Sequence, residues 1–424
     1  MSKYKTARGM HDILPDESVL WQRVETVAAS TMSSYGYHQI RLPLLENTEL
    51  FARSAGETSD IVQKQMYTFG DQEGSSLTLR PEGTAGCARA FIQNGLHKAG
   101  PQRLWYGGSM FRHERPQKGR YRQFDQIGVE AFGVPDAGLE AELIGMMTDV
   151  LDGIGVLSSI TLELNSIGDP ADRASYRSAL QSYFRRYEGE IDEDSRLRLD
   201  RNPMRILDSK DGRTREIARD APLMSDYLGD DARAHYDELR NLLAKSGVAW
   251  QENDRLVRGL DYYNRSVFEW TTAELGSQGT VCGGGRYDGL VELVGGPATP
   301  AAGFALGVDR LVLLMTALQG EGRAGVDIYV AVADNDLQGA AMQLAQQARR
   351  ALPGWSVRLN QGGGRLKAQM RRADSAGARF ALVLGVDEAA RGEVSVKFLS
   401  EDRPQETVSI ERAMELLAGA SRTS

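Results

Sequence analysis

The chain has 424 residues, of which 41% are hydrophobic and 25% charged, with a formal net charge of −8. This composition is typical of a globular protein of two or three domains, and the acidic balance argues against a protein that coats nucleic acid nonspecifically. Two cysteines give no disulfide framework, and no apolar stretch is long enough to predict a secretory signal or a membrane span. We therefore expect a cytoplasmic protein without a membrane partner.

The first third of the chain is predicted to alternate helices with pairs of strands. Pro43 lies within a predicted strand, which indicates a sheet edge or an interface because proline lacks the N–H of a central strand. In chain order the predicted elements are a helix over 17–35, a strand over 36–51, two strands around a Gly-Ser turn within 66–86, a helix over about 83–95, and two strands around a basic loop within 109–133.

In the rest of the chain, the pattern of residues changes twice. Asp169 and Pro170 are typical of a helix N-cap and first helical position, and charged helical sequence follows. The next predicted elements are an inserted, mostly helical region over 170–250, a strand over 255–272, a glycine-rich turn within 281–296, and a strand passing into a buried helix over 300–318. After a linker at 319–325, strands and helices alternate, which predicts a small α/β domain with a mixed sheet.

The hairpin around the basic loop carries an unusual mixture of side chains on one face. Residues two apart in a strand share a face, so Phe124, Gln126 and Glu130 point the same way. Tyr106 and Arg112 share a parity on the preceding strand. A guanidinium, an aromatic ring, an amide and a carboxylate suit a ligand pocket better than an apolar core. A solvated hairpin face with a charged tip is the alternative that this pattern leaves open.

The loop of this hairpin gathers cations, with Glu114 as the opposing charge: Arg112, His113, Arg115, Lys118, Arg120 and Arg122. Such a cluster predicts a phosphate site. The sequence has no GxxxxGK[ST] loop and no GxGxxG after a strand. A bound triphosphate would therefore be held by arginines on an antiparallel sheet, with Phe124 stacking on the base.

Five segments resemble class II aminoacyl-tRNA synthetases, and specifically the histidyl-tRNA synthetases. Motif 1 is similar to "QIRLPLLENTELF", motif 2 to "FRHERPQKGRYRQFDQIGVEAFG", and motif 3 to "GFALGVDRLVLL" with Arg310. The segments "LVRGLDYYNRSVFEW" and "GTVCGGGRYDGLVELVGG" resemble the two that are peculiar to histidyl-tRNA synthetases. The match runs from Gly9 through the C-terminal domain.

The resemblance implies an α+β fold. It would combine a class II antiparallel-sheet catalytic core, interrupted by a helical insertion, with a small C-terminal α/β domain that binds the anticodon. The implied boundaries are 1–169 and 251–322 for the two parts of the core, 170–250 for the insertion, and 326–424 for the anticodon-binding domain. Motif 1 supports the dimer interface in this class, which implies a homodimer.

The resemblance further implies that the chain activates L-histidine with ATP and Mg²⁺ and transfers it to the histidine tRNA. Arg112 and Arg258 would be catalytic, on opposite sides of the α-phosphate. Histidine would be bound by Glu82, Thr84, Arg112, Gln126, Glu130, Arg258, Tyr262, Tyr263 and Tyr287. ATP would be bound by Arg112, Glu114, Arg120, Phe124 and Arg310, and no metal ligand is assigned to the protein.

The expected chemistry agrees with these residue types. The attacking carboxylate of the amino acid is already ionised, so the reaction needs alignment and fixed positive charge more than a base. Glu82 and Thr84 would hold the amino group, and Glu130 and Tyr263 would each bind one imidazole nitrogen. A pocket that satisfies both nitrogens rejects apolar amino acids, so we expect no editing domain. The base of the transfer step is left unassigned.

Three regions are candidates for contact with tRNA. Arg115, Gln117 and Lys118 in the motif 2 loop would reach its 3′ end, with Gln117 near a base edge. The insertion would clamp the acceptor arm of the tRNA, although its arginine-rich sequence also fits a solvated helical face. In the C-terminal domain the candidates are Arg365, Lys367, Arg371 and Arg372, some of which would merely cover a helix.

Some residues are better explained without chemistry. Tyr262 and Tyr263 fall on opposite faces of the predicted strand, so only one is expected to face the ligand fully. Cys282, beside three glycines, is interpreted as a small residue in a tight strand rather than a nucleophile. The five histidines are scattered, without a HExxH motif, so we expect no zinc site.

Three other functions compete with this hypothesis. The first is the catalytically inactive, synthetase-like regulatory subunit of ATP phosphoribosyltransferase, which typically lacks the anticodon domain and the Arg258 segment. The second is a class II synthetase for proline, threonine or glycine, which Glu130 and "LDYYNR" argue against because a carboxylate suits a ring that donates a hydrogen bond. The third is a pure RNA-binding module, which would leave Glu82, Gln126 and Glu130 unexplained.

Overall fold

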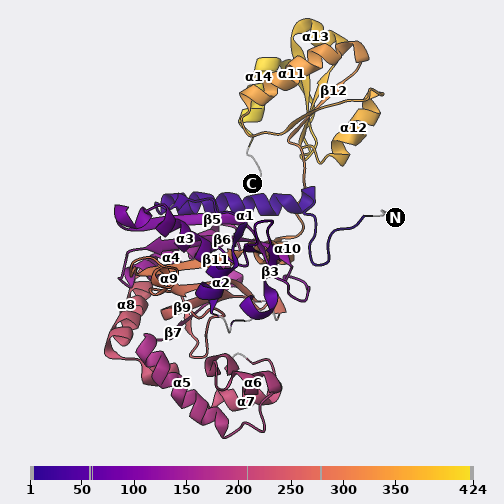
Figure 1. Ribbon diagram of the computed structural model, residues 1–424. Coiled ribbons are helices and arrows are strands. Elements are labelled where there is room, and N and C mark those ends of the chain that lie inside the picture. Colours follow the sequence, from indigo (N-terminus) through magenta and orange to yellow (C-terminus); the bar gives the residue numbers. More distant parts are fainter. Residues whose placement is uncertain (1–3, 57–58, 60, 208, 277–278, 421–424) are drawn as a thin grey trace. The chain divides into compact units, whose positions relative to one another are not determined.

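The computed structural model describes residues 4–420 with gaps at 57–58, 60, 208 and 277–278 (Figure 1). By its internal packing the chain divides into two compact units. One comprises Leu20–Gly320 with the residues up to Ile13, and the other runs from Glu321 to the C-terminus with Leu14–Val19. Within the described residues, no helix is both long and apolar enough to cross a membrane.

The described residues of the first unit form an eight-stranded sheet in the order β1-β5-β6-β11-β10-β9-β7-β8. Neighbouring strands are antiparallel except for the outer pairs β1–β5 and β7–β8. The strands are β1 (His38–Gln39), β5 (Gln102–Phe111), β6 (Gln123–Phe132), β7 (Thr161–Ser166), β8 (Gln251–Glu252), β9 (Asn264–Thr271), β10 (Thr280–Arg286) and β11 (Ala301–Gly307). This sheet confirms the predicted α+β class.

The two faces of the sheet have different covers. Helices α1 (Pro15–Ser34), α4 (Gly138–Gly153), α8 (Asp230–Ser246) and α10 (Val308–Gln319) form the main apolar core on one face. Ile127, Val129 and Ala131 of β6 point into this core, as the period-two pattern predicts. Helices α3 (Thr84–Gln93) and α9 (Leu290–Leu293) pack on the other face. That second face carries the candidate site.

The segment around Pro43 differs from the predicted single strand. Two short strands, β1 and β2, lie on either side of this proline, and a helix follows instead of further strand. Proline cannot donate to a ladder, which explains the break. The predicted Gly-Ser hairpin is confirmed, and it pairs with β2 in a three-stranded sheet. These elements are β2 (Leu45–Asn47), α2 (Thr48–Ala55), the π-helical turn Ile61–Gln65, β3 (Tyr67–Gly70) and β4 (Ser76–Leu79).

Between β7 and β8 the chain is helical, in α5 (Pro170–Arg185), α6 (Glu193–Arg198), α7 (Gly212–Arg219) and α8 (Figure 1). As predicted, α5 starts at Pro170, after a capping box between Asp169 and Asp172. Helices α5–α7 enclose a small apolar core of their own, whereas α8 packs in the main core. The predicted insertion therefore contributes to two cores, and its role as one domain stays a prediction.

The second unit confirms the predicted small α/β domain with a mixed sheet. Its strand order is β13-β12-β14-β15-β16, parallel in the first two pairings and antiparallel in the last two. Its elements are β12 (Ile328–Val332), α11 (Gln338–Ala351), β13 (Val357–Leu359), α12 (Leu366–Ser375), β14 (Phe380–Leu384), α13 (Val386–Arg391), β15 (Glu393–Phe398), β16 (Glu406–Ser409) and α14 (Ile410–Ala418).

The glycine-rich sequence predicted as a turn proves to be a central strand. Gly283, Gly284 and Gly285 lie within β10, between β9 and β11. A Cβ at Gly284 would fall on the carbonyl oxygen of Gly303 and within 2.6 Å of the Phe268 ring. Glycines are therefore needed here for close packing in the sheet rather than for chain reversal.

Candidate active site

A cavity of about 370 Å³ opens on the second face of the large sheet. Its walls come from β6, β10, β11, the first turn of α10, the loop after β5, and the segment before β9. Every residue expected to bind histidine or ATP lies on this wall: Glu82, Thr84, Arg112, Glu114, Arg120, Phe124, Gln126, Glu130, Arg258, Tyr262, Tyr263, Tyr287 and Arg310. The fold thus brings together residues from distant parts of the sequence, while the role of each residue stays a prediction.

One end of the cavity is built around Glu130, which is 1% exposed to solvent. Its carboxylate accepts hydrogen bonds from the hydroxyls of Tyr106, at 2.8 Å, and Tyr287. Burial raises the pKa of Glu130 to about 8, and the hydrogen bonds from Tyr287 and Tyr106 oppose this rise. The site therefore holds a carboxyl group that can change its protonation near neutral pH.

A second buried carboxylate, Glu82, lies at the start of α3. It accepts hydrogen bonds from the backbone N–H groups of Thr84, at 2.6 Å, and Ala85, at 3.0 Å. Burial raises the pKa of Glu82, and these two backbone donors counteract it. Helix N-termini stabilise anions in this way, and the carboxylate remains on the cavity wall as an acceptor for a cationic group.

Three tyrosines form an aromatic wall beside Glu130. The ring centroids of Tyr262 and Tyr263 are 4.7 Å apart, and that of Tyr287 lies 5.5 Å from Tyr262 and 6.0 Å from Tyr263. The expectation that only one of Tyr262 and Tyr263 can face the ligand is wrong, because both line the cavity. They lie in a turn that precedes β9, so the alternation of a strand does not apply to them.

The other end of the cavity gathers guanidinium groups. Arg112 donates to the carbonyl oxygen of Pro81 at 2.9 Å, and its guanidinium carbon lies 5.2 Å from the Phe124 ring centroid. Arg310 donates to the carbonyl oxygens of Gly119, at 3.1 Å, and Thr280, at 2.5 Å. Burial lowers the pKa of Arg310, and the neighbouring cations Arg120 and Arg112 lower it further. Such mutual repulsion between cations favours the binding of a polyanion.

Arg258 reaches the cavity from the segment before β9. Its guanidinium carbon lies 5.5 Å from the ring centroid of Tyr263, and it forms an ion pair with Glu269 of β9. Burial alone would lower the pKa of Arg258, but Glu269 and Tyr263 raise it overall. The Thr280 hydroxyl donates to the second Glu269 oxygen at 3.0 Å, so this carboxylate is fixed from both sides.

Sequence reasoning missed some residues of the site. Glu269 and Asp309 line the cavity, and burial raises the pKa of Asp309 to about 6. Nothing in the sequence marks Glu269 as a partner of Arg258. Parity predicts the face of Tyr106 correctly, but its hydrogen bond to Glu130 depends on the register between β5 and β6, which parity does not give.

The residues expected to contact RNA have the following environments. Arg115, Gln117 and Lys118 are exposed on the loop between β5 and β6. Arg365, Lys367 and Arg371 are exposed, Arg365 at the N-cap of α12 and the other two within the helix. Arg372 instead donates to Asn360 at 2.7 Å and to the carbonyl oxygens of Gln361 and Gly363, so it holds the preceding glycine loop.

Neither Cys282 nor a metal cluster adds to this chemistry. Burial raises the pKa of the Cys282 thiol well above its ordinary value, which disfavours a nucleophilic thiolate. Among the residues that the structure describes, no three His, Cys, Asp or Glu side chains gather as metal ligands. The protein side chains alone therefore do not form a cage for Mg²⁺, which usually binds through one or two carboxylates and the phosphates of a nucleotide.

The chain matches family models of known proteins along most of its length. A family model described as Histidyl-tRNA synthetase matches residues 9–311, and a model described as Anticodon binding domain matches residues 327–419. The solved structure of apo S. aureus histidyl-tRNA synthetase is 34% identical, with a TM-score of 0.79 over 98% of this chain and 100% of that chain.

Two further solved structures are similar over most of the chain. Histidyl-tRNA synthetase from Nostoc sp. PCC 7120 shares the fold at 18% identity, with a TM-score of 0.75 over 98% of this chain and 99% of that one. A protein from Bacillus halodurans C, described as an ATP phosphoribosyltransferase regulatory subunit/histidyl-tRNA synthetase, is 26% identical, with a TM-score of 0.65 over 91% of this chain and 99% of that one.

Proposed function

The chain belongs to the histidyl-tRNA synthetase family, and we propose that it activates L-histidine with ATP and transfers the histidyl group to the 3′ end of the histidine tRNA. One observation carries the proposal: a single cavity joins a buried carboxylate among tyrosine hydroxyls to four guanidinium groups. The first end suits an imidazole, which donates and accepts hydrogen bonds in fixed directions. The second end suits a triphosphate.

In the first step, a carboxylate oxygen of histidine attacks the α-phosphorus of ATP and pyrophosphate leaves. Glu82 and Thr84 hold the amino group, and Glu130 with the tyrosines binds the imidazole. Arg112 and Arg258 stabilise the negative charge that develops at the α-phosphate, while Arg120 and Arg310 bind the leaving phosphates. When bound with ATP, Mg²⁺ would neutralise further charge on the phosphates that Arg120 and Arg310 hold.

In the second step, the 3′-hydroxyl of the terminal tRNA adenosine attacks the carbonyl carbon of the adenylate and AMP leaves. The exposed residues Arg115, Gln117 and Lys118 lie on the loop that borders the cavity, which suits contact with the acceptor end. The second unit would bind the anticodon through Arg365, Lys367 and Arg371 on α12. We further propose that the protein is a cytoplasmic homodimer.

The alternative is a regulatory subunit of ATP phosphoribosyltransferase that binds histidine without activating it. The similarity to the Bacillus halodurans protein motivates this alternative. Two features favour the enzyme. Arg258 lies in the cavity with a fixed carboxylate partner, and an anticodon-binding domain follows the linker. A protein that only senses histidine needs neither feature.

The proposal is tested by ATP–pyrophosphate exchange with single amino acids. We expect exchange that depends on histidine and is absent with proline, threonine and glycine. Arg258→Ala should slow the exchange by about 10²–10³-fold, because it removes a charge that acts in the transition state, and the accompanying loss of histidine affinity should be smaller than this loss of rate. Histidine binding without exchange in the wild-type protein would support the regulatory alternative, and exchange driven by another amino acid would contradict the specificity.

A further inference from the structure

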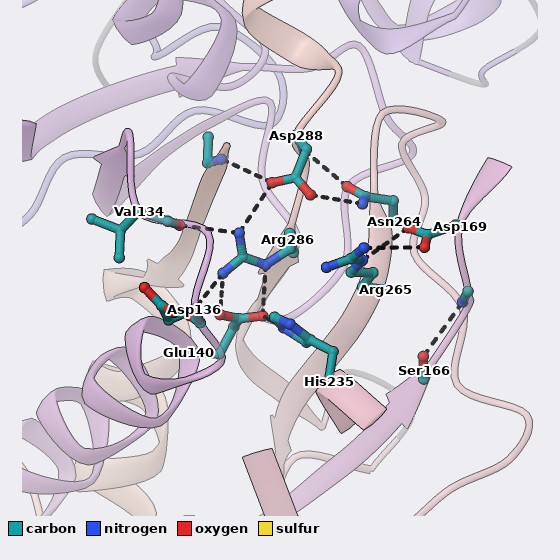
Figure 2. Close-up of polar contacts among 12 residues, drawn as sticks. Val134, Asp136, Glu140, Ser166, Asp169, His235, Asn264, Arg265, Arg286 and Asp288 are labelled. Atoms are coloured by element: carbon teal, nitrogen blue, oxygen red, sulfur yellow. Dashed lines mark hydrogen bonds and ion pairs between the residues drawn. The ribbon is translucent and has the colours of Figure 1, made fainter. Parts of the chain in front are cut away.

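A network of polar side chains surrounds Arg286 and Asp288 (Figure 2). At its centre, Asn264 and Asp288 form a reciprocal pair. The Asn264 amide donates to Asp288 Oδ2 at 3.0 Å, and its carbonyl oxygen accepts the backbone N–H of Asp288 at 2.8 Å. Asn264 directly follows Tyr263, and Asp288 directly follows Tyr287. The pair therefore joins the two segments that carry the ring-binding tyrosines.

Asp288 is held in turn by Arg286, which precedes Tyr287. Its Oδ1 atom accepts from Arg286 Nη1 at 3.1 Å and from the backbone N–H of Ala301 at 3.0 Å. The Arg286 side chain is 1% exposed, and its remaining donors reach Glu140 at 2.8 and 2.5 Å and the carbonyl oxygens of Val134 and Asp136 at 3.1 Å. All five N–H groups of this guanidinium are therefore satisfied.

Figure 2 shows the Glu140 carboxylate between Arg286 and His235 of α8. The His235 ring nitrogen Nε2 lies 2.7 Å from Glu140 Oε1. Burial alone would raise the pKa of Glu140, but the hydrogen bonds from Arg286 and His235 hold it below its ordinary value. This fully buried anion is thus stabilised by two partners, and it anchors Arg286 to the main core.

The backbone beside the pair is strained. Arg265, which follows Asn264, has a φ of 51°, and no other non-glycine residue in the described chain has a positive φ. The ladder between β9 and β10 shifts register at the same place, between Gly285 and Arg286. Two hydrogen bonds from Arg265 to Asp169, at 2.9 and 3.2 Å, hold this conformation. Strain that the surroundings enforce in this way is typical of residues that orient a site.

We propose that Asn264 and Asp288 are positioning residues that set the affinity of the cavity for an imidazole side chain. They fix Tyr263 and Tyr287 at a centroid separation of 6.0 Å, with the Tyr287 hydroxyl directed at Glu130. Neither residue lines the cavity, so both act through the tyrosines. The inference rests on the proposed function in that histidine is taken as the ligand.

The test changes Asn264 and Asp288 singly, and then exchanges them, in the full-length protein. Asn264→Asp sets two carboxylates against each other, and Asp288→Asn leaves a donor or an acceptor without its partner. We expect each single variant to raise the Kd of histidine by about tenfold, as loss of an aligned hydrogen bond implies, with the KM of ATP nearly unchanged. The double variant Asn264→Asp/Asp288→Asn exchanges the amide and the carboxylate. It reverses the hydrogen bond between the two side chains. It preserves the bonds with the backbone N–H at position 288, with Arg286 and with the backbone N–H of Ala301, and it should restore the Kd.

Histidine binding is measured by calorimetry, because this readout stands even if the wild-type protein fails to catalyse pyrophosphate exchange. Asp149→Asn is the matched control: Asp149 is exposed on α4, where it accepts from the Tyr35 hydroxyl at 2.6 Å. Melting temperatures are compared for all variants. Single variants that melt lower yet bind histidine like the wild type would overturn the proposal, and so would a double variant no better than the singles.

Discussion

Glu130 illustrates how one buried carboxyl group can define a ligand pocket. Its two oxygens are occupied by the hydroxyls of Tyr106 and Tyr287, and burial raises its pKa to about 8. The neutral acid therefore predominates below that pH in the absence of a ligand. An imidazole that donates a hydrogen bond to Glu130 would favour the carboxylate, so ligand binding and protonation are coupled at this side chain.

We expect Glu130→Gln to change how stability depends on pH. The pKa of about 8 in the folded protein exceeds the ordinary value of 4.5. Between these values the folded state keeps a proton that the unfolded chain releases, so the contribution of Glu130 to the free energy of unfolding falls as pH rises. Glutamine does not titrate. The melting temperature of the variant relative to wild type, measured calorimetrically without ligands, should therefore be higher at pH 8.5 than at pH 5. A difference independent of pH would contradict the assignment.

At the scale of the element, successive residues of strand β10 face opposite sides of the sheet, one side in the main core and the other in the cavity. Gly284 faces Phe268 and Phe304 of the main core, whereas Gly283 faces Arg258 in the cavity. A Cβ at Gly284 would meet backbone on the neighbouring strand, which cannot yield. A Cβ at Gly283 would lie 2.5 Å from a terminal nitrogen of Arg258, at the far end of a side chain that can move.

Alanine at these adjacent positions should therefore have different effects. Gly284→Ala should destabilise the protein by about 1–3 kcal/mol through overpacking of the sheet. Gly283→Ala should melt close to wild type but slow histidine-dependent pyrophosphate exchange, because it displaces Arg258 from its place between Glu269 and Tyr263. Thermal unfolding and exchange assays on both variants check this. Equal losses of stability in the two variants would show that the two faces are not distinct.

At the scale of the whole molecule, the chain consists of two units with separate apolar cores. The candidate active site lies entirely within the first unit. The exposed cations on α12 belong to the second, which matches an anticodon-binding family model. Under the proposed function, amino-acid activation and recognition of a distant part of tRNA belong to different units, so their effects on the reaction should be separable.

We expect Arg365→Ala/Lys367→Ala/Arg371→Ala to raise the KM for tRNA, while pyrophosphate exchange, which needs no tRNA, continues. The slope of log KM against log salt should fall by about one for each phosphate contact removed. Arg391→Ala is the control, because Arg391 is an exposed arginine of the same unit whose partner is Glu393. Charging kinetics at several salt concentrations give the comparison. An unchanged KM in the triple variant would exclude α12 from the RNA interface.

The sequence by itself determined the fold class and the small α/β domain that follows the linker, and its resemblance to a family named many, but not all, of the residues that line the cavity. Periodicity sufficed for β6, where each residue's face follows from its parity. Local rules sufficed at Asp169 and Pro170, because a helix start depends on a few neighbouring residues. The residues from Arg112 to Arg310 that meet in the cavity could be named through their resemblance to a family, although no local rule links them.

Only the tertiary structure decided which partners these residues have. The pairing of Glu269 with Arg258, the placing of Tyr262 and Tyr263 on one wall, and the strand conformation of Gly283–Gly285 all depend on contacts between segments distant in sequence. Such contacts are set by strand register, by a bulge, or by steric exclusion across a sheet, and none of these has a local signature. Resemblance to a family therefore named many residues of the site, and packing fixed how they face one another.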